Sequence, residues 1–138
     1  MTRYLTVEQA LRIARAAVGG PIHVRDIGLL EAAVHRPRTS VLGQDAYPDL
    51  LTKAAALLHS LARNHPVVDG NKRLAWLATY TFLAKNDVVL EADDDPAYDL
   101  VVSVAAGTID DVEEIAARLA TLQEARRERE RDRGAGSG

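Results

Sequence analysis

The stretch LLTKAAALLHSLARNHPVVDGNKRLAWLATYTFLAKN, residues 50–86, contains two apolar segments joined by a short polar loop. Residues 50–64 are rich in alanine and leucine, which predicts a central buried helix. Pro66 disfavours helical geometry at His65, so we expect this helix to end there. A second buried helix is expected from residue 71 to about residue 86. The loop between them, within HPVVDGNKR at residues 65–73, would then lie against the core.

Helical signals continue on both sides of this pair. Thr6 and Gln9 have the spacing of a capping box, and the helix that they start should end at Gly19 and Gly20. No helical period is visible over residues 38–49, apart from a candidate extended piece near residues 40–42. The remaining helices are expected at residues 27–35, 96–107 and 108–122. The fold class is therefore predicted as all-α, a compact single-domain helical bundle over residues 1–124. Residues 125–138 are expected to form a charged, Gly/Ser-rich C-terminal tail that is flexible over its last five residues.

Composition narrows the function before any motif is considered. With 138 residues, of which 47% are hydrophobic, the chain is long enough for one core and short for two domains. A net charge of -3 argues against direct binding of nucleic acid, which needs a basic surface. No segment has the pattern of an export signal or a membrane span. The absence of cysteine excludes a cysteine-zinc site and fits the reducing cytoplasm, where we expect the protein to work.

The loop HPVVDGNKR leads directly into the start of a predicted helix. Unpaired backbone N–H groups and the positive end of the helix dipole favour an anion at such a place. Lys72 and Arg73 would lie in the first turn, where cations are unfavourable unless an anion joins them. Gly70 and Asn71 precede them, and the Asn71 side chain can cap the helix or donate to an oxyanion. A phosphate group would satisfy this arrangement.

Two further residues of the loop suggest chemistry at that phosphate. Asp69 offers a hard oxygen ligand of the kind that Mg²⁺ accepts beside substrate phosphates. His65 has the side chain best suited to remove a proton near neutral pH. Taken together, the loop supplies a base, a metal ligand and an anion cradle. Each residue alone also fits an ordinary role in a turn or helix end, but five such coincidences in nine residues are much less frequent.

Other kinds of functional site have less support in the sequence. The chain has no H-E-x-x-H spacing for zinc, and a Walker A loop ending at Lys72 would need glycine at His65 and Ser or Thr at Arg73. The remaining histidines are expected to be structural. Trp76, with Tyr80 and Leu83 on the same helix, is expected to belong to the core.

The motif HPVVDGNKR resembles the signature H-x-F-x-D/N-A/G-N-K-R of the Doc (death-on-curing) toxins, a branch of the Fic/Doc superfamily. The segments VRDIGLLEAAVHRPR and GQDAYPDLLTKAAALLHSLARN also resemble that branch. One departure is Val67, which stands where the signature has phenylalanine and fills less of the core under the loop. The resemblance implies the Fic/Doc type of helical bundle with a short flap loop.

That resemblance also implies an activity. Doc toxins are ATP-dependent protein kinases that transfer the γ-phosphate to a threonine of elongation factor Tu and arrest translation, and a cognate antitoxin holds them inactive. By this likeness His65 would be the base, Lys72 would select the phosphate that reacts, and Asp69 would bind Mg²⁺. Residues 40–47 resemble the flap that holds the target beside the site. The remaining assignments are Gly70, Asn71, Lys72 and Arg73 for the nucleotide phosphates, and Ser40, Val41, Leu42 and Gly43 for the flap.

Two alternatives stay open. Fic relatives with glycine where Lys72 stands, and usually arginine where Trp76 stands, transfer AMP rather than phosphate. Lys72 argues against that reaction here. A helical interaction module that binds an anion without turnover is the alternative from outside the enzymes.

Overall fold

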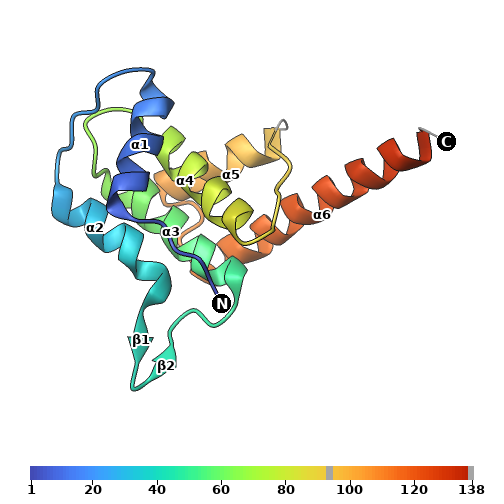
Figure 1. Cartoon of the computed structure of the whole chain (residues 1–138), viewed down its shortest axis with the longest axis horizontal. Coiled ribbons are helices and arrows are strands. Elements are labelled where there is room, and N and C mark those ends of the chain that lie inside the picture. The colour runs from blue at the N-terminus through green and yellow to red at the C-terminus, as the bar shows by residue number, and fades with distance from the viewer. Residues whose placement is uncertain (93–94, 137–138) are drawn as a thin grey trace.

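The computed structural model describes residues 1–92 and 95–136, and it is all-α apart from one small hairpin (Figure 1). This arrangement confirms the predicted fold class. Among the described residues, no helix is long and apolar enough to cross a membrane. The elements in chain order are α1 (Val7–Val18), α2 (Ile27–His35), the 3-10 turn η1 (Arg36–Arg38), β1 (Ser40–Val41), β2 (Gln44–Asp45), α3 (Leu50–Asn64), α4 (Asn71–Lys85), α5 (Asp95–Ala106) and α6 (Val112–Gly136).

Helix α3 is the centre of the bundle, as the sequence predicted. Ten of its fifteen residues are buried, so side chains on nearly every face meet another element. It packs most extensively against α4 and also contacts α2, α5 and α6. Residues that are almost wholly buried in both helices form the middle of the core: Leu57, Leu58, Leu61, Leu74, Phe82 and Leu83. Burial of these side chains is the main stabilising term for the arrangement that positions the loop between α3 and α4.

Local hydrogen bonds explain where the first helices begin. The Thr6 hydroxyl accepts a bond of 3.1 Å from the Gln9 backbone N–H, and the Gln9 side chain accepts one of 2.9 Å from the Thr6 N–H. The expected capping box is thereby confirmed. Asp26 caps α2 through the Leu29 N–H at 3.1 Å. The start of α3 is fixed in the same way by Asp49.

Strands β1 and β2 form an antiparallel hairpin whose two-residue turn is Leu42 and Gly43. Both turn residues have positive φ, 53° and 78°, as the tight hairpin turn that matches strand twist requires. At its base, Asp45 pairs with the buried Lys53 at 3.2 Å and Tyr47 accepts a bond from Arg36 at 3.0 Å. The hairpin is thus attached to the beginning of α3.

The hairpin does not lie beside the loop that follows α3, where the sequence resemblance placed it. Figure 1 shows the hairpin leaving the bundle at one end of α3, whereas the loop leaves at the other end. A helix of fifteen residues is about 22 Å long, and α3 is continuous over that length. The expected position of the flap is therefore wrong, because α3 separates the two features.

Helix α6 continues well past residue 122, where the sequence predicted its end. Its final turns project from the bundle (Figure 1). Ion pairs at helical spacing support the extension, including Arg126 with Glu130 at 3.1 Å. Arg129 also reaches the buried Glu91 at 2.7 Å. The flexible end that we expected over residues 134–138 is helical to residue 136, and residues 137–138 lie outside the described part of the chain.

Candidate functional site

The loop of residues 65–70, called the motif loop from here on, begins and ends in left-handed backbone. His65 has φ 49° and ψ 61°, a conformation that costs a residue with a side chain about 1–2 kcal/mol. Gly70 has φ 84°, and a Cβ added there would lie 2.7 Å from Cγ1 of Val18 on α1. Glycine is required at this position both for the dihedral angle and for space. Local backbone strain of this kind is often found at functional sites.

Asn71 stabilises the inside of the motif loop. Its Oδ1 accepts from the Val67 N–H at 3.1 Å, and its Nδ2 donates to the Val67 carbonyl at 2.8 Å. The cap position of α4 is Gly70, which offers no side-chain hydrogen bond. The prediction that Asn71 caps the helix is therefore wrong: its amide is used to fold the loop. Val67 itself is buried and belongs to the core cluster.

A strap formed by residues 23–26 runs along the outside of the motif loop. An isolated antiparallel bridge joins Val24 to Val67. The Val68 N–H donates to the His23 carbonyl at 2.9 Å, and the Arg25 N–H donates to the Pro66 carbonyl at 2.8 Å. Sequence reasoning missed the strap, because such a pairing between distant segments leaves no periodic signal. It holds the motif loop in one backbone conformation.

The first turn of α4 has features that favour the binding of an anion. It contains Lys72 and Arg73 and no acidic residue, and among the described residues no side chain caps the N–H groups at its start. Arg73 makes one long bond of 3.4 Å to the Ala17 carbonyl, at the end of α1. Within residues 1–92 and 95–136, no hydrogen bond or ion pair engages the side chains of His65, Asp69 or Lys72, and all three are exposed. These groups are therefore available to a ligand.

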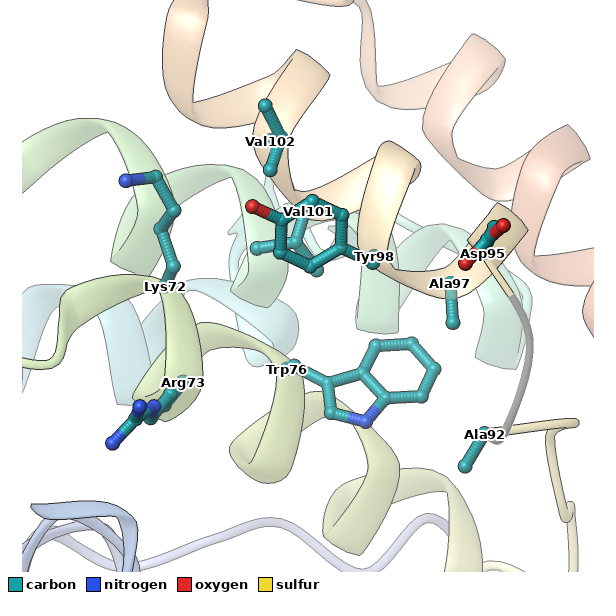
Figure 2. A pocket seen from close by; sticks show the side chains of 9 residues that line it. All are labelled: Lys72, Arg73, Trp76, Ala92, Asp95, Ala97, Tyr98, Val101 and Val102. Atoms are coloured by element: carbon teal, nitrogen blue, oxygen red, sulfur yellow. The ribbon is translucent and has the colours of Figure 1, made fainter.

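A cavity of about 490 Å³ opens beside this turn, between α4 and α5. Figure 2 shows Lys72 and Arg73 at one end, Asp95 at the other, and the rings of Trp76 and Tyr98 between them. The volume lies within the range of about 300–1,000 Å³ that is usual for small-molecule sites. An apolar, aromatic wall that ends in two cations suits a ligand with a ring and phosphates. The other lining residues are Ala92, Ala97, Val101 and Val102.

Trp76 and Tyr98 line this cavity, a position that the pattern of residues in the sequence did not predict for either of them. We expected Trp76 in the core; it is partly buried and packs against the core, and it also lines the cavity. Its position four residues after Lys72, on the same helix face, is the signal that could have indicated it. Tyr98 comes from α5 and could be placed only by the packing of α5 against α4. The cavity wall contains Lys72 and Arg73 but neither His65 nor Asp69, which lie on the adjoining motif loop.

The side chains at the motif loop are of the kind that binds a magnesium ion together with substrate phosphates. Nowhere in the described part of the chain do three or more His, Cys, Asp or Glu side chains gather to hold a metal by themselves. Mg²⁺, however, is commonly held by one or two carboxylates together with substrate phosphates and water. Asp69, an exposed carboxylate just before the uncapped turn, can provide such a ligand.

Comparison with known proteins adds an independent finding. Residues 4–83 match the model of the Fic/DOC family, a span that covers the strap, α3, the motif loop and most of α4. The chain is also 56% identical over 122 residues to a protein named Toxin Doc from Mycolicibacterium smegmatis (strain ATCC 700084 / mc(2)155). This alignment covers 87% of the present chain and 93% of that relative.

Proposed function

This chain belongs to the Fic/DOC family as a Doc toxin, and we propose that it transfers the γ-phosphate of ATP to a hydroxyl group of a target protein. The observation that carries the proposal is the first turn of α4. There, two cations and uncapped N–H groups meet a cavity with aromatic walls. Lys72 is central, since AMP-transferring relatives have glycine at its position.

The cavity and the first turn of α4 would bind different parts of the nucleotide. The adenine ring would lie against Trp76 and Tyr98, because aromatic faces stack well on a purine. The phosphates would then reach Lys72, Arg73 and the free N–H groups at the helix start. Asn71 would contribute its backbone N–H, since its side chain folds the loop. The terminal phosphate would face the motif loop.

The proposed reaction is a direct displacement at phosphorus. A hydroxyl oxygen of the target bonds to the γ-phosphorus while the bond to the bridging oxygen breaks, and ADP leaves. His65 takes the proton of the attacking hydroxyl, and its imidazole has no competing partner in the described residues. Lys72 and Arg73 neutralise the charge on the phosphates. Asp69 would hold Mg²⁺, which supplies further charge neutralisation when it is bound.

For the target we propose a threonine of elongation factor Tu, in line with the resemblance to the Doc branch, and hence an arrest of translation in the cytoplasm. The hairpin offers a docking element for such a protein. Val41 and Leu42 are exposed apolar residues at its tip, with Ser40 and Gly43 beside them. Because α3 lies between the hairpin and the motif loop, the hairpin would bind a part of the target remote from the reacting threonine.

A toxin of this kind needs a partner that keeps it inactive in its own cell, and we propose a cognate antitoxin. Expression of the unaltered chain without that antitoxin should arrest growth. The variant His65→Ala should be tolerated at the same level of soluble protein. Normal growth at high soluble expression of the unaltered chain would contradict the toxin assignment.

The central experiment uses ATP labelled at either the γ- or the α-phosphate, with purified elongation factor Tu and Mg²⁺. We expect the γ label alone to move to the protein. Movement of the α label would show AMP transfer instead. Binding of ATP without movement of either label would identify an interaction module that has no turnover.

A further inference from the structure

Arg25 binds the backbone of the proposed base. Its Nε donates to the His65 carbonyl at 2.6 Å, and one terminal nitrogen donates to the Asn64 carbonyl at 2.7 Å. Both carbonyls lie at the end of α3, where an α-helix leaves its last carbonyls without partners inside the helix. A planar guanidinium can satisfy two of them at once, and a cation is electrostatically favourable at this end of the dipole.

These bonds act where the chain changes conformation. His65 is the left-handed residue that ends α3, so a small rotation of its backbone would swing the imidazole by a large amount. The strap already binds the next residue, since the N–H groups of Arg25 and Asp26 both donate to the Pro66 carbonyl, at 2.8 and 3.1 Å. The Arg25 side chain adds the two carbonyls before it. Residues 64–66 are thereby held by one short segment.

We propose that Arg25 is a positioning residue for phosphoryl transfer, acting through the His65 backbone rather than on the substrate. The inference rests on the proposed function of His65 as the base. Its physical basis is that a catalytic group displaced by about 1 Å can lose on the order of 10²-fold in rate. Truncating the Arg25 side chain removes its hydrogen bonds to the carbonyls of Asn64 and His65 but leaves the main-chain hydrogen bonds between the strap and the motif loop. The loop should therefore stay folded with a less well-placed histidine.

The first test compares Arg25→Ala with Arg25→Lys and with a matched control, Arg63→Ala. Arg63 is also an exposed arginine near the end of α3, but it pairs with Asp110 and the Ala105 carbonyl. For Arg25→Ala we expect kcat to fall about 10- to 100-fold while KM for ATP and for the target is unchanged. Lysine cannot reach both carbonyls with fixed geometry, so Arg25→Lys should recover only part of kcat. Arg63→Ala should keep the parent kcat.

Chemical rescue makes the test specific. Because Arg25 is exposed, methylguanidinium added to Arg25→Ala should reach the two carbonyls and raise kcat, and it should leave Arg63→Ala unaffected. An Arg25→Ala protein with the parent kcat would overturn the inference. So would a loss of kcat accompanied by an equal rise of KM, which would show that the substitution acts on substrate binding rather than on the placement of the base.

A spectroscopic measurement separates this inference from the proposed function. The ring resonances of His65 in the NMR spectrum should shift or broaden in Arg25→Ala and return when methylguanidinium is added. Unchanged resonances would overturn the positioning role even if transfer is observed. If the unaltered protein transfers no phosphate, the proposed function fails, while the response of these resonances still decides whether Arg25 positions His65.

Discussion

His65 combines an exposed imidazole with a backbone conformation that few residues adopt. The variant His65→Ala should lose roughly 10²- to 10⁴-fold in transfer rate, which is the usual contribution of a general base. Its affinity for ATP should be unchanged, because in the proposed arrangement α4, and not His65, binds the phosphates. Transfer can be measured with γ-labelled ATP and binding by calorimetry.

The left-handed backbone calls for a second variant as a control. Asparagine tolerates this conformation better than alanine, so His65→Asn should keep the parent stability and still lack transfer. A His65→Ala protein with full activity would contradict the role of the base. If His65→Ala lost transfer and His65→Asn kept the parent transfer rate, the loss would come from the backbone conformation and not from the missing imidazole.

Lys72 tests which phosphate reacts. Lys72→Met removes the charge while keeping a good helix former, and Lys72→Gly creates the residue of AMP-transferring relatives. Both should abolish γ transfer and leave the helical circular dichroism unchanged, since the side chain is exposed and makes no bond in the described residues. We expect no gain of α transfer, because Trp76 stands where those relatives usually have a second arginine. Undiminished γ transfer by either variant would show that Lys72 does not select the reaction.

At the scale of the elements, the turn of the hairpin contains a residue that is unfavourable for stability. Leu42 is 99% exposed and has positive φ, so this large apolar residue is unfavourable in both respects. Leu42→Asn should raise the free energy of unfolding by a few tenths to about 1 kcal/mol, because asparagine suits this turn position. If the tip docks the target, KM for elongation factor Tu should rise while KM for ATP stays constant. An unchanged KM for the target would exclude Leu42 from docking.

The elements that the sequence predicted well are those whose signals are local. The capping pair Thr6 and Gln9 and the residue Pro66 act within a few residues, and the helix ends that they predict agree with the structure. The hairpin position and the cavity wall at Tyr98 depend on how distant segments pack. Neither hydrophobic period nor turn chemistry contains that information, so both had to come from the structure.

At the scale of the whole molecule, an ion pair between Arg129 and Glu91 ties the projecting end of α6 to the bundle. Glu91 is 2% exposed and Arg129 reaches it at 2.7 Å. Arg129→Met should lower the free energy of unfolding by roughly 1–3 kcal/mol, since a buried acceptor loses a charged donor. Arg127→Met is a matched control, because Arg127 lies 3.9 Å from an exposed Glu124 and should matter by less than about 0.5 kcal/mol. Equal effects of the two variants in urea unfolding would show that the contact to Glu91 contributes little.

The cavity between α4 and α5 has an optical consequence. Trp76 is the single tryptophan of the chain, and its indole ring forms part of the cavity wall. The fluorescence emission of the unmodified protein, excited at the tryptophan band, therefore reports on this one place. A purine that stacks on the ring should quench the emission in a saturable way, and a dissociation constant can be obtained without label or enzyme assay. His65→Ala should give the same titration curve, so occupancy of the cavity can be followed separately from turnover.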